Sequence, residues 1–130
     1  MLSIKAILAK PFAKIIYKQI QKWANKPIET QEKLFHDLIS TAASTAFGID
    51  HDFISINSYS DFIKRVPVRD YEALKPYVEK VVKGQENVLW PGKPIYFAKT
   101  SGTTSGSKYI PITKESMPYH IESARNAILL

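Results

Sequence analysis

Apolar and basic residues alternate at helical spacing through the first 26 residues. Four apolar residues recur every fourth position, at Leu8, Phe12, Ile16 and Ile20. Four lysines recur with the same step, displaced by two positions, at Lys10, Lys14, Lys18 and Lys22. Because two residues turn a helix by about 200°, this pattern predicts an amphipathic helix with an apolar face and a basic face. Pro11 suits the first turn of the helix or a kink in it, so we expect the helix to strengthen after residue 10.

A second apolar ladder predicts a helix from Thr30 to Phe47. Its members follow one another at helical spacing: Leu34, Phe35, Leu38, Ile39, Ala42, Ala43 and Ala46. A hydroxyl side chain is a favoured helix cap, so Thr30 is expected to cap this helix. Gly48 is expected to close it in the left-handed conformation.

Capping residues and breakers predict two shorter helices further along the chain. The stretch "SYSDFIKRV", residues 58–66, is typical of a brief capped helix that Pro67 stops. Asp70 opens the next helix, whose apolar pattern is split by Pro76 and ended by Gly84. The stretch "NVLWPGKP" that follows is a turn-rich connection.

Two strands and a last helix are predicted in the final part of the chain. The strands cover residues 95–98 and 109–112, and Pro111 restricts the second to an edge or a short ladder. The last helix covers roughly residues 116–130 and ends in the apolar run "ARNAILL" with no helix terminator. We therefore expect the amino-terminal part of a larger α/β domain, mostly helical, with a short β-hairpin. Its segments are a basic amphipathic helix (1–26), a helical region (27–94), a strand-loop-strand unit (95–113) and a truncated helix (114–130).

Charge and composition narrow the classes of function. The net charge is +6, and residues 1–26 contain six lysines and no acidic residue, whereas the remaining twelve basic residues balance all twelve acidic ones. The basic face is interpreted as solvated surface, with contact to an acidic membrane surface or nucleic acid as the alternative. Cysteine is absent, which excludes disulfides and thiolate metal sites. His36, His51 and His120 lack the spacing of metal ligands, and the longest uncharged run, 12 residues, is shorter than the roughly 20 of a membrane span.

The stretch between the two predicted strands is unusual. Residues 100–107 are only glycine, serine or threonine, and Lys108 follows. Glycines let an anion approach the backbone amides, hydroxyls add donors, and lysine adds a positive charge. An ordinary hydroxyl-rich hairpin and a phosphate-binding loop both fit this composition. The nucleotide-hydrolase P-loop does not fit, because Ser107 stands where its second glycine is needed, and G-x-G-x-x-G lacks its third glycine.

Longer motifs favour the phosphate-binding loop, through a resemblance to a known family. "KTSGTTSGSK" resembles the phosphate-loop signature of acyl-adenylate-forming enzymes. The chain also contains the motifs V-P-V-x-x-Y-E-x-L-K-P-Y, W-P-G-K-P and F-A-K-T-S-G-T-T. Together with the loop, these motifs resemble the amino-terminal part of the auxin-responsive-promoter family of acyl-acid–amido synthetases. The resemblance covers residues 47–113 well. The chain departs from the superfamily pattern where Ser105 separates Thr104 from Gly106 and where Ser107 replaces a frequent proline.

The resemblance implies an ATP- and Mg²⁺-dependent ligase in the cytoplasm. Such an enzyme adenylates a small-molecule carboxylic acid and transfers the acyl group to an amino acid. The residues implied to bind the nucleotide are Thr100, Ser101, Gly102, Thr103, Thr104, Gly106 and Lys108. No catalytic or metal-ligating residue is assigned, and the 130 residues alone are expected to be inactive. We expect no nucleic-acid partner and no membrane span. The membrane contact that stays open is a peripheral one through residues 1–26. The rival hypothesis is a small basic helical module that binds an acidic membrane surface or nucleic acid.

Overall fold

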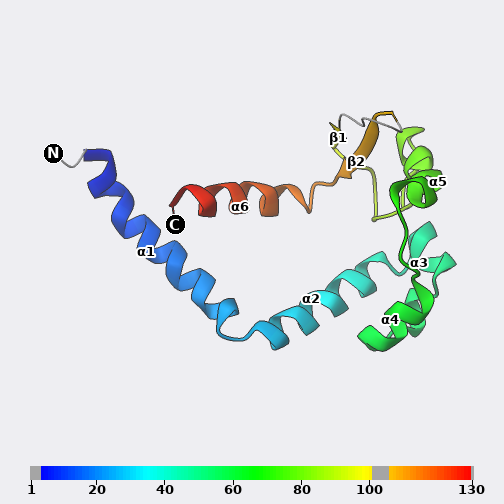
Figure 1. Cartoon of the computed structure of the whole chain (residues 1–130), viewed down its shortest axis with the longest axis horizontal. Coiled ribbons are helices and arrows are strands. Elements are labelled where there is room, and N and C mark those ends of the chain that lie inside the picture. The colour runs from blue at the N-terminus through cyan, green and yellow to red at the C-terminus, as the bar shows by residue number, and fades with distance from the viewer. Residues whose placement is uncertain (1–3, 101–105, 130) are drawn as a thin grey trace. The chain divides into compact units, whose positions relative to one another are not determined.

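The computed structural model describes residues 4–100 and 106–129 of the chain (Figure 1). The chain divides into two compact units. The first unit contains residues 1–33 and 115–130, and the second contains residues 34–114. The described residues form helices and one two-stranded sheet, so the prediction of a mostly helical α/β segment with a short hairpin is confirmed.

The first unit is built on two helices that contact each other. Helix α1 (Ile4–Ala24) contains Pro11 within its length, and helix α6 (Met117–Leu129) packs against it. Ile16 is buried, whereas Phe12 on the same predicted apolar face keeps 48% of its surface exposed. The predicted amphipathic helix is therefore confirmed, but its apolar face is only partly buried.

Helix α2 (Pro27–Ala42) and helix α3 (Ala46–Asp50) replace the single helix predicted from Thr30 to Phe47. Both predicted ends were wrong. Thr30 lies inside α2, and its hydroxyl donates to the carbonyl of Trp23 at 3.4 Å. Gly48 lies buried inside α3, and its φ is not among the positive values of the described residues. A Cβ at Gly48 would overlap the carbonyl oxygen of Ala42, so glycine is needed there for close packing.

Thr45 explains why the helix divides. Its backbone is extended, its hydroxyl accepts from the amide of Gly48 at 3.0 Å, and it donates to the carbonyl of Ala42 at 2.7 Å. Thr45 is fully buried, so these two bonds satisfy a hydroxyl that has no access to water. The amides of Ala46 and Phe47 donate to the carbonyls of residues 87 and 88, which satisfies the first turn of α3 from a distant segment.

The shorter helices follow the predicted capping pattern. A 3₁₀ turn, η1 (Phe53–Ser55), precedes α4 (Tyr59–Arg65), which Ser58 caps through the amide of Asp61. Helix α5 (Tyr71–Val82) is capped by Asp70 through the amide of Ala73. Gly84 follows it, as predicted, and has a φ of 89°. Pro76 lies within α5, so the split that it makes in the apolar pattern does not interrupt the helix.

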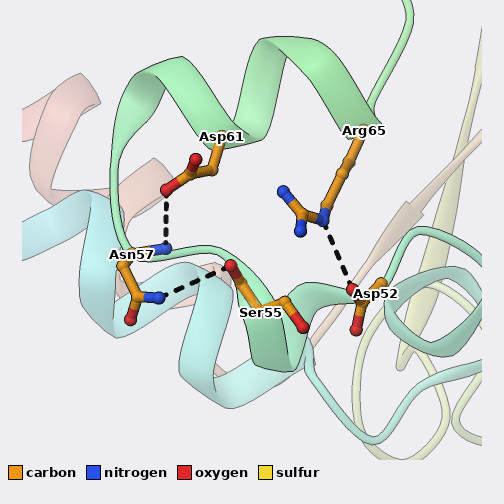
Figure 2. Close-up of polar contacts among 5 residues, drawn as sticks. All are labelled: Asp52, Ser55, Asn57, Asp61 and Arg65. Carbon is orange, nitrogen blue, oxygen red and sulfur yellow. Dashed lines mark hydrogen bonds and ion pairs between the residues drawn. The ribbon is translucent and has the colours of Figure 1, made fainter.

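Figure 2 shows how α4 is held at both ends. The carboxylate of Asp61 accepts from the amide of Asn57 at 3.3 Å (Figure 2). It also accepts from the hydroxyl of Ser58 at 2.7 Å. The hydrogen bond from Ser58 is the main cause that lowers the pKa of Asp61. At the other end, Nε of Arg65 lies 3.3 Å from Oδ2 of Asp52, a left-handed residue with a φ of 51°.

The core of the second unit lies where α2, α3, η1 and α4 meet. Its buried members are Ile39, Ala42, Phe53 and Ile56. Aromatic rings surround them, and the ring centroids of Phe35 and Phe62 lie 5.8 Å apart in an edge-to-face arrangement. Trp90, from the predicted turn-rich connection, packs against the same cluster. Phe47, which packs against this core, also contacts α5, since its ring centroid lies 5.1 Å from that of Tyr77.

The sheet is an antiparallel hairpin of strand β1 (Tyr96–Thr100) and strand β2 (Lys108–Ile112). Thr100 is paired with Lys108 at one end of the ladder, and Pro111 is paired with Phe97 near the other. Each strand has a single partner in this sheet, so Pro111 lies on an edge, as predicted.

Candidate functional site

The hairpin places both ends of the glycine- and hydroxyl-rich stretch next to each other. Thr100 and Lys108 are register partners, so the intervening residues leave and return at one point. Gly106 has a φ of 80°, a left-handed conformation that favours glycine. A Cβ there would meet open space, so the backbone of Gly106 is accessible from outside.

Three of the seven predicted nucleotide-binding residues can be placed. Thr100, Gly106 and Lys108 lie together at the loop end of the hairpin. Ser101, Gly102, Thr103 and Thr104 lie outside the described residues. The assignment of the nucleotide-binding residues therefore stays a prediction, and the structure gives the positions of the two ends of the loop.

Helix α5 contacts the hairpin beside this point. The amide of Tyr109 donates to the hydroxyl of Tyr71 at 2.9 Å. Nζ of Lys108 lies 5.4 Å from the centroid of the Tyr71 ring, within the roughly 6 Å range of a cation–π interaction. Tyr71 lies in the first turn of α5, directly after the capping residue Asp70.

An open cleft of about 320 Å³ lies between α5 and the hairpin. Val78 and Val82 contribute apolar surface, and Lys75 contributes a cation. Ser107 and Tyr109 line the cleft from the hairpin. The cleft therefore places apolar side chains of α5 next to the last residue of the loop and the start of β2.

A second polar cluster joins α3 to α5. The hydroxyl of Tyr77 donates to Oδ2 of Asp50 at 2.7 Å, and this hydrogen bond, followed by burial, raises the pKa of Tyr77. The ring of His51 stacks on Phe47 with 4.1 Å between centroids, and its Nδ1 lies 2.7 Å from the carbonyl oxygen of Phe47. Arg69 covers the Phe47 ring at 5.7 Å. These contacts connect helices, and they explain Asp50 and His51 without a catalytic role.

Sequence reasoning missed Tyr71 and Tyr77 as contacts of the site and of the helix junction. Their partners lie 38 and 27 positions away. The signal that was available is their presence in V-P-V-x-x-Y-E-x-L-K-P-Y, where they are the two tyrosines. Within residues 4–100 and 106–129, no group of three or more His, Cys, Asp or Glu side chains is placed to hold a metal. None of the helices described there combines the length and the apolar character that crossing a bilayer requires.

The comparison with protein families gives one match over most of the chain. A family model described as the GH3 family N-terminal domain matches residues 16–129. The match includes all the elements from α2 to α6.

Individual relatives agree with this match. A probable indole-3-acetic acid-amido synthetase, GH3.13 of Oryza sativa subsp. japonica, is 43% identical over 43% of the chain. The indole-3-acetic acid-amido synthetase GH3.2 of Arabidopsis thaliana is 28% identical over 77% of the chain. The 4-substituted benzoates-glutamate ligase GH3.12 of the same plant is 29% identical over 64% of the chain. The chain spans 12%, 19% and 18% of the lengths of these three proteins.

Proposed function

We propose that this chain, which belongs to the GH3 family, carries the triphosphate-binding loop of an ATP-dependent acyl-acid–amido synthetase. The observation that carries the proposal is the paired geometry of Thr100 and Lys108. It brings both ends of a glycine- and hydroxyl-rich stretch to one point. The names of the relatives, amido synthetases and a benzoates-glutamate ligase, support a reaction between a carboxylic acid and an amino acid.

The proposed reaction has two steps. A carboxylate oxygen attacks the α-phosphorus of ATP, the bond from that phosphorus to the bridging oxygen breaks, and pyrophosphate leaves. The amine of an amino acid then attacks the carbonyl carbon, loses a proton, and expels AMP as the amide forms. The protein's part in the first step is to position the polyphosphate and offset its charge.

The loop residues divide this task by their chemistry. Hydroxyls of Ser101, Thr103 and Thr104 would donate to phosphate oxygens. Gly102 and Gly106 would let those oxygens approach backbone amides, and the open backbone of Gly106 fits that role. Two residues frame the loop: Thr100 would shape its start, and Lys108 would supply charge at its end.

Mg²⁺ fits this scheme as a companion of the nucleotide. It binds through phosphate oxygens and water more than through a protein cage, so it requires no carboxylate cluster in this chain. When bound, it would neutralise charge on the phosphate oxygens during the attack. The hydroxyl-rich loop supplies neutral donors that can act beside it.

We propose the cytoplasm as the compartment of this reaction, which the family resemblance implies and with which the absence of cysteine is compatible. The 130 residues alone should bind nucleotide and lack turnover, because they span less than a fifth of the relatives' lengths. Calorimetric titration with ATP and Mg²⁺ tests the binding, and inorganic tripolyphosphate in place of ATP tests whether the phosphates carry it. Binding of AMP but not of tripolyphosphate would refute a triphosphate loop.

A second candidate function rests on α1. The side chains of Lys10, Lys14, Lys18 and Lys22 are exposed. Two large apolar side chains of the same helix, Ile15 and Trp23, each keep 54% of their surface exposed. Basic and apolar side chains on one exposed helix are typical of contact with an acidic membrane surface. Sedimentation with phosphatidylserine vesicles, in low and high salt, tests this candidate, and nucleic acid in the same assay tests the alternative partner.

A further inference from the structure

Tyr71 contacts both Lys108 and Tyr109. Its hydroxyl accepts from the amide of Tyr109 at 2.9 Å, and its ring lies 5.4 Å from Nζ of Lys108. Both contacts link the first turn of α5 to the first two residues of β2. Val78 and Val81 are buried and anchor the same helix. Tyr71 therefore connects a fixed helix to the point where the chain leaves the loop.

We propose that Tyr71 is a positioning residue that presents the charge of Lys108 to the bound triphosphate, an inference that rests on the proposed function. A lysine side chain has a flexible four-carbon stem, and ordering it on binding lowers affinity. The ring face attracts the ammonium before the ligand arrives, so the side chain loses less conformational entropy on binding. The hydrogen bond from the amide of Tyr109 to the hydroxyl of Tyr71 fixes the backbone of Tyr109, the residue after Lys108.

The choice of a ring, and not a carboxylate, fits this role. A carboxylate beside Lys108 would form an ion pair that competes with phosphate. Across the described part of the chain, no carboxylate lies within ion-pair distance of Lys108. Lys75 on the same cleft differs, because its Nζ lies 3.5 Å from a carboxylate oxygen of Glu72. The ring of Tyr71 thus orders Lys108 and leaves its charge available.

Two substitutions separate the two contacts. Tyr71→Phe keeps the ring and removes the hydroxyl, whereas Tyr71→Leu removes both. In Tyr71→Phe we expect faster hydrogen exchange of the Tyr109 amide and an unchanged ring-current shift on the Lys108 side chain. In Tyr71→Leu we expect both signatures to be lost. Tyr77→Phe is the matched control, because it removes a hydroxyl of the same helix that bonds to Asp50 and not to the hairpin.

Affinity for inorganic tripolyphosphate then tests the role. We expect Tyr71→Leu to weaken binding about two- to fivefold, the effect of losing one exposed cation–π interaction. In a Lys108→Ala background the same substitution should have no further effect, because Tyr71 acts through Lys108. A purely structural role predicts instead an equal loss in both backgrounds. Tyr71→Phe should recover most of the affinity.

The outcomes separate this inference from the proposed function. Unchanged exchange and unchanged shifts in Tyr71→Leu would show that the contacts are absent, which overturns the inference. Altered contacts with undiminished tripolyphosphate affinity would also overturn it, while leaving the triphosphate loop intact. If the unmodified chain shows both contacts but binds no tripolyphosphate, the triphosphate loop itself is refuted, and the role of Tyr71 with it.

Discussion

Tyr77 and Asp50 join helix α5 to the end of helix α3 through a 2.7 Å hydrogen bond. The two residues are 27 positions apart, and the bond lies beside the stacked rings of Phe47 and His51. The V-P-V-x-x-Y-E-x-L-K-P-Y motif therefore makes contacts with two different parts of the second unit. Tyr71 contacts the hairpin, and six residues later Tyr77 contacts the helical core region.

The Tyr77 hydroxyl should contribute to stability. Tyr77→Phe removes the donor and leaves the partly exposed carboxylate of Asp50 to water, so the loss should be about 0.5–1.5 kcal/mol. Urea denaturation followed by circular dichroism measures it. Tyr96→Phe is the control, because Tyr96 is 62% exposed on the hairpin. An equal loss in both variants would contradict the structural role of the Tyr77–Asp50 bond.

The same bond predicts a loss of stability in alkali. The hydrogen bond to Asp50 and burial raise the pKa of Tyr77 above its ordinary value of 10.0. A group whose pKa is raised on folding stabilises the fold below its unfolded pKa, and this contribution disappears as pH rises through its folded pKa. Denaturation from pH 8 to pH 11 should therefore show a decline that is smaller in Tyr77→Phe. Parallel curves for the two proteins would exclude this linkage.

Ser58 should control the ionisation of Asp61. The hydroxyl of Ser58 is the largest cause of the lowered pKa of Asp61, ahead of the amide of Asn57. Ser58→Ala should therefore move that pKa upward, toward the ordinary value of 3.8. Because a lowered pKa stabilises the fold only above the unfolded value, this contribution is lost as pH falls through the folded pKa. Carbon-detected NMR titration of the Asp61 carboxyl, in the unmodified chain and in Ser58→Ala, measures the change.

Gly48 should be the glycine least tolerant of alanine among those placed in the second unit. An added Cβ would overlap the carbonyl of Ala42 in a close-packed region, so Gly48→Ala should destabilise the fold by roughly 1–3 kcal/mol or more. Gly84→Ala is the matched control, because a Cβ there meets open space and only its φ of 89° opposes the change. That backbone strain is about 1–2 kcal/mol. Thermal unfolding compares the two, and a smaller loss at Gly48 would contradict the packing described.

Local signals predicted much of this fold because helix ends depend on nearby residues. Ser58 and Asp70 cap their helices through amides three positions ahead, and Gly84 ends α5. These interactions need no knowledge of the tertiary structure. The hairpin was also predicted, because apolar strand-like residues flank the loop on both sides.

The errors arose where distant segments decide the structure. The division between α2 and α3 depends on buried Thr45 and on carbonyls of residues 87 and 88, which no local pattern reveals. The apolar ladder also overstated burial, since Leu34 and Leu38 keep 50% and 46% of their surfaces exposed. Likewise, the composition of the loop indicated its donors, but not that Tyr71 contacts the residues at its end.

Substitutions in the loop should impair adenylation more than folding. In a full-length protein that contains this chain, Thr104→Ala removes a proposed hydroxyl donor and Lys108→Ala removes the proposed cation. Either change should lower acid-dependent pyrophosphate release at least about tenfold, because preorganised donors to phosphate act in the transition state. The melting temperature should change little, since Lys108 is not buried. Lys99→Ala is the matched control, because Lys99 lies on the same hairpin opposite Tyr109 and has no proposed role. Pyrophosphate release that persists undiminished in both loop variants would remove these residues from the reaction, and a loss in Lys99→Ala of the same size would attribute the effect to the hairpin's charge as a whole.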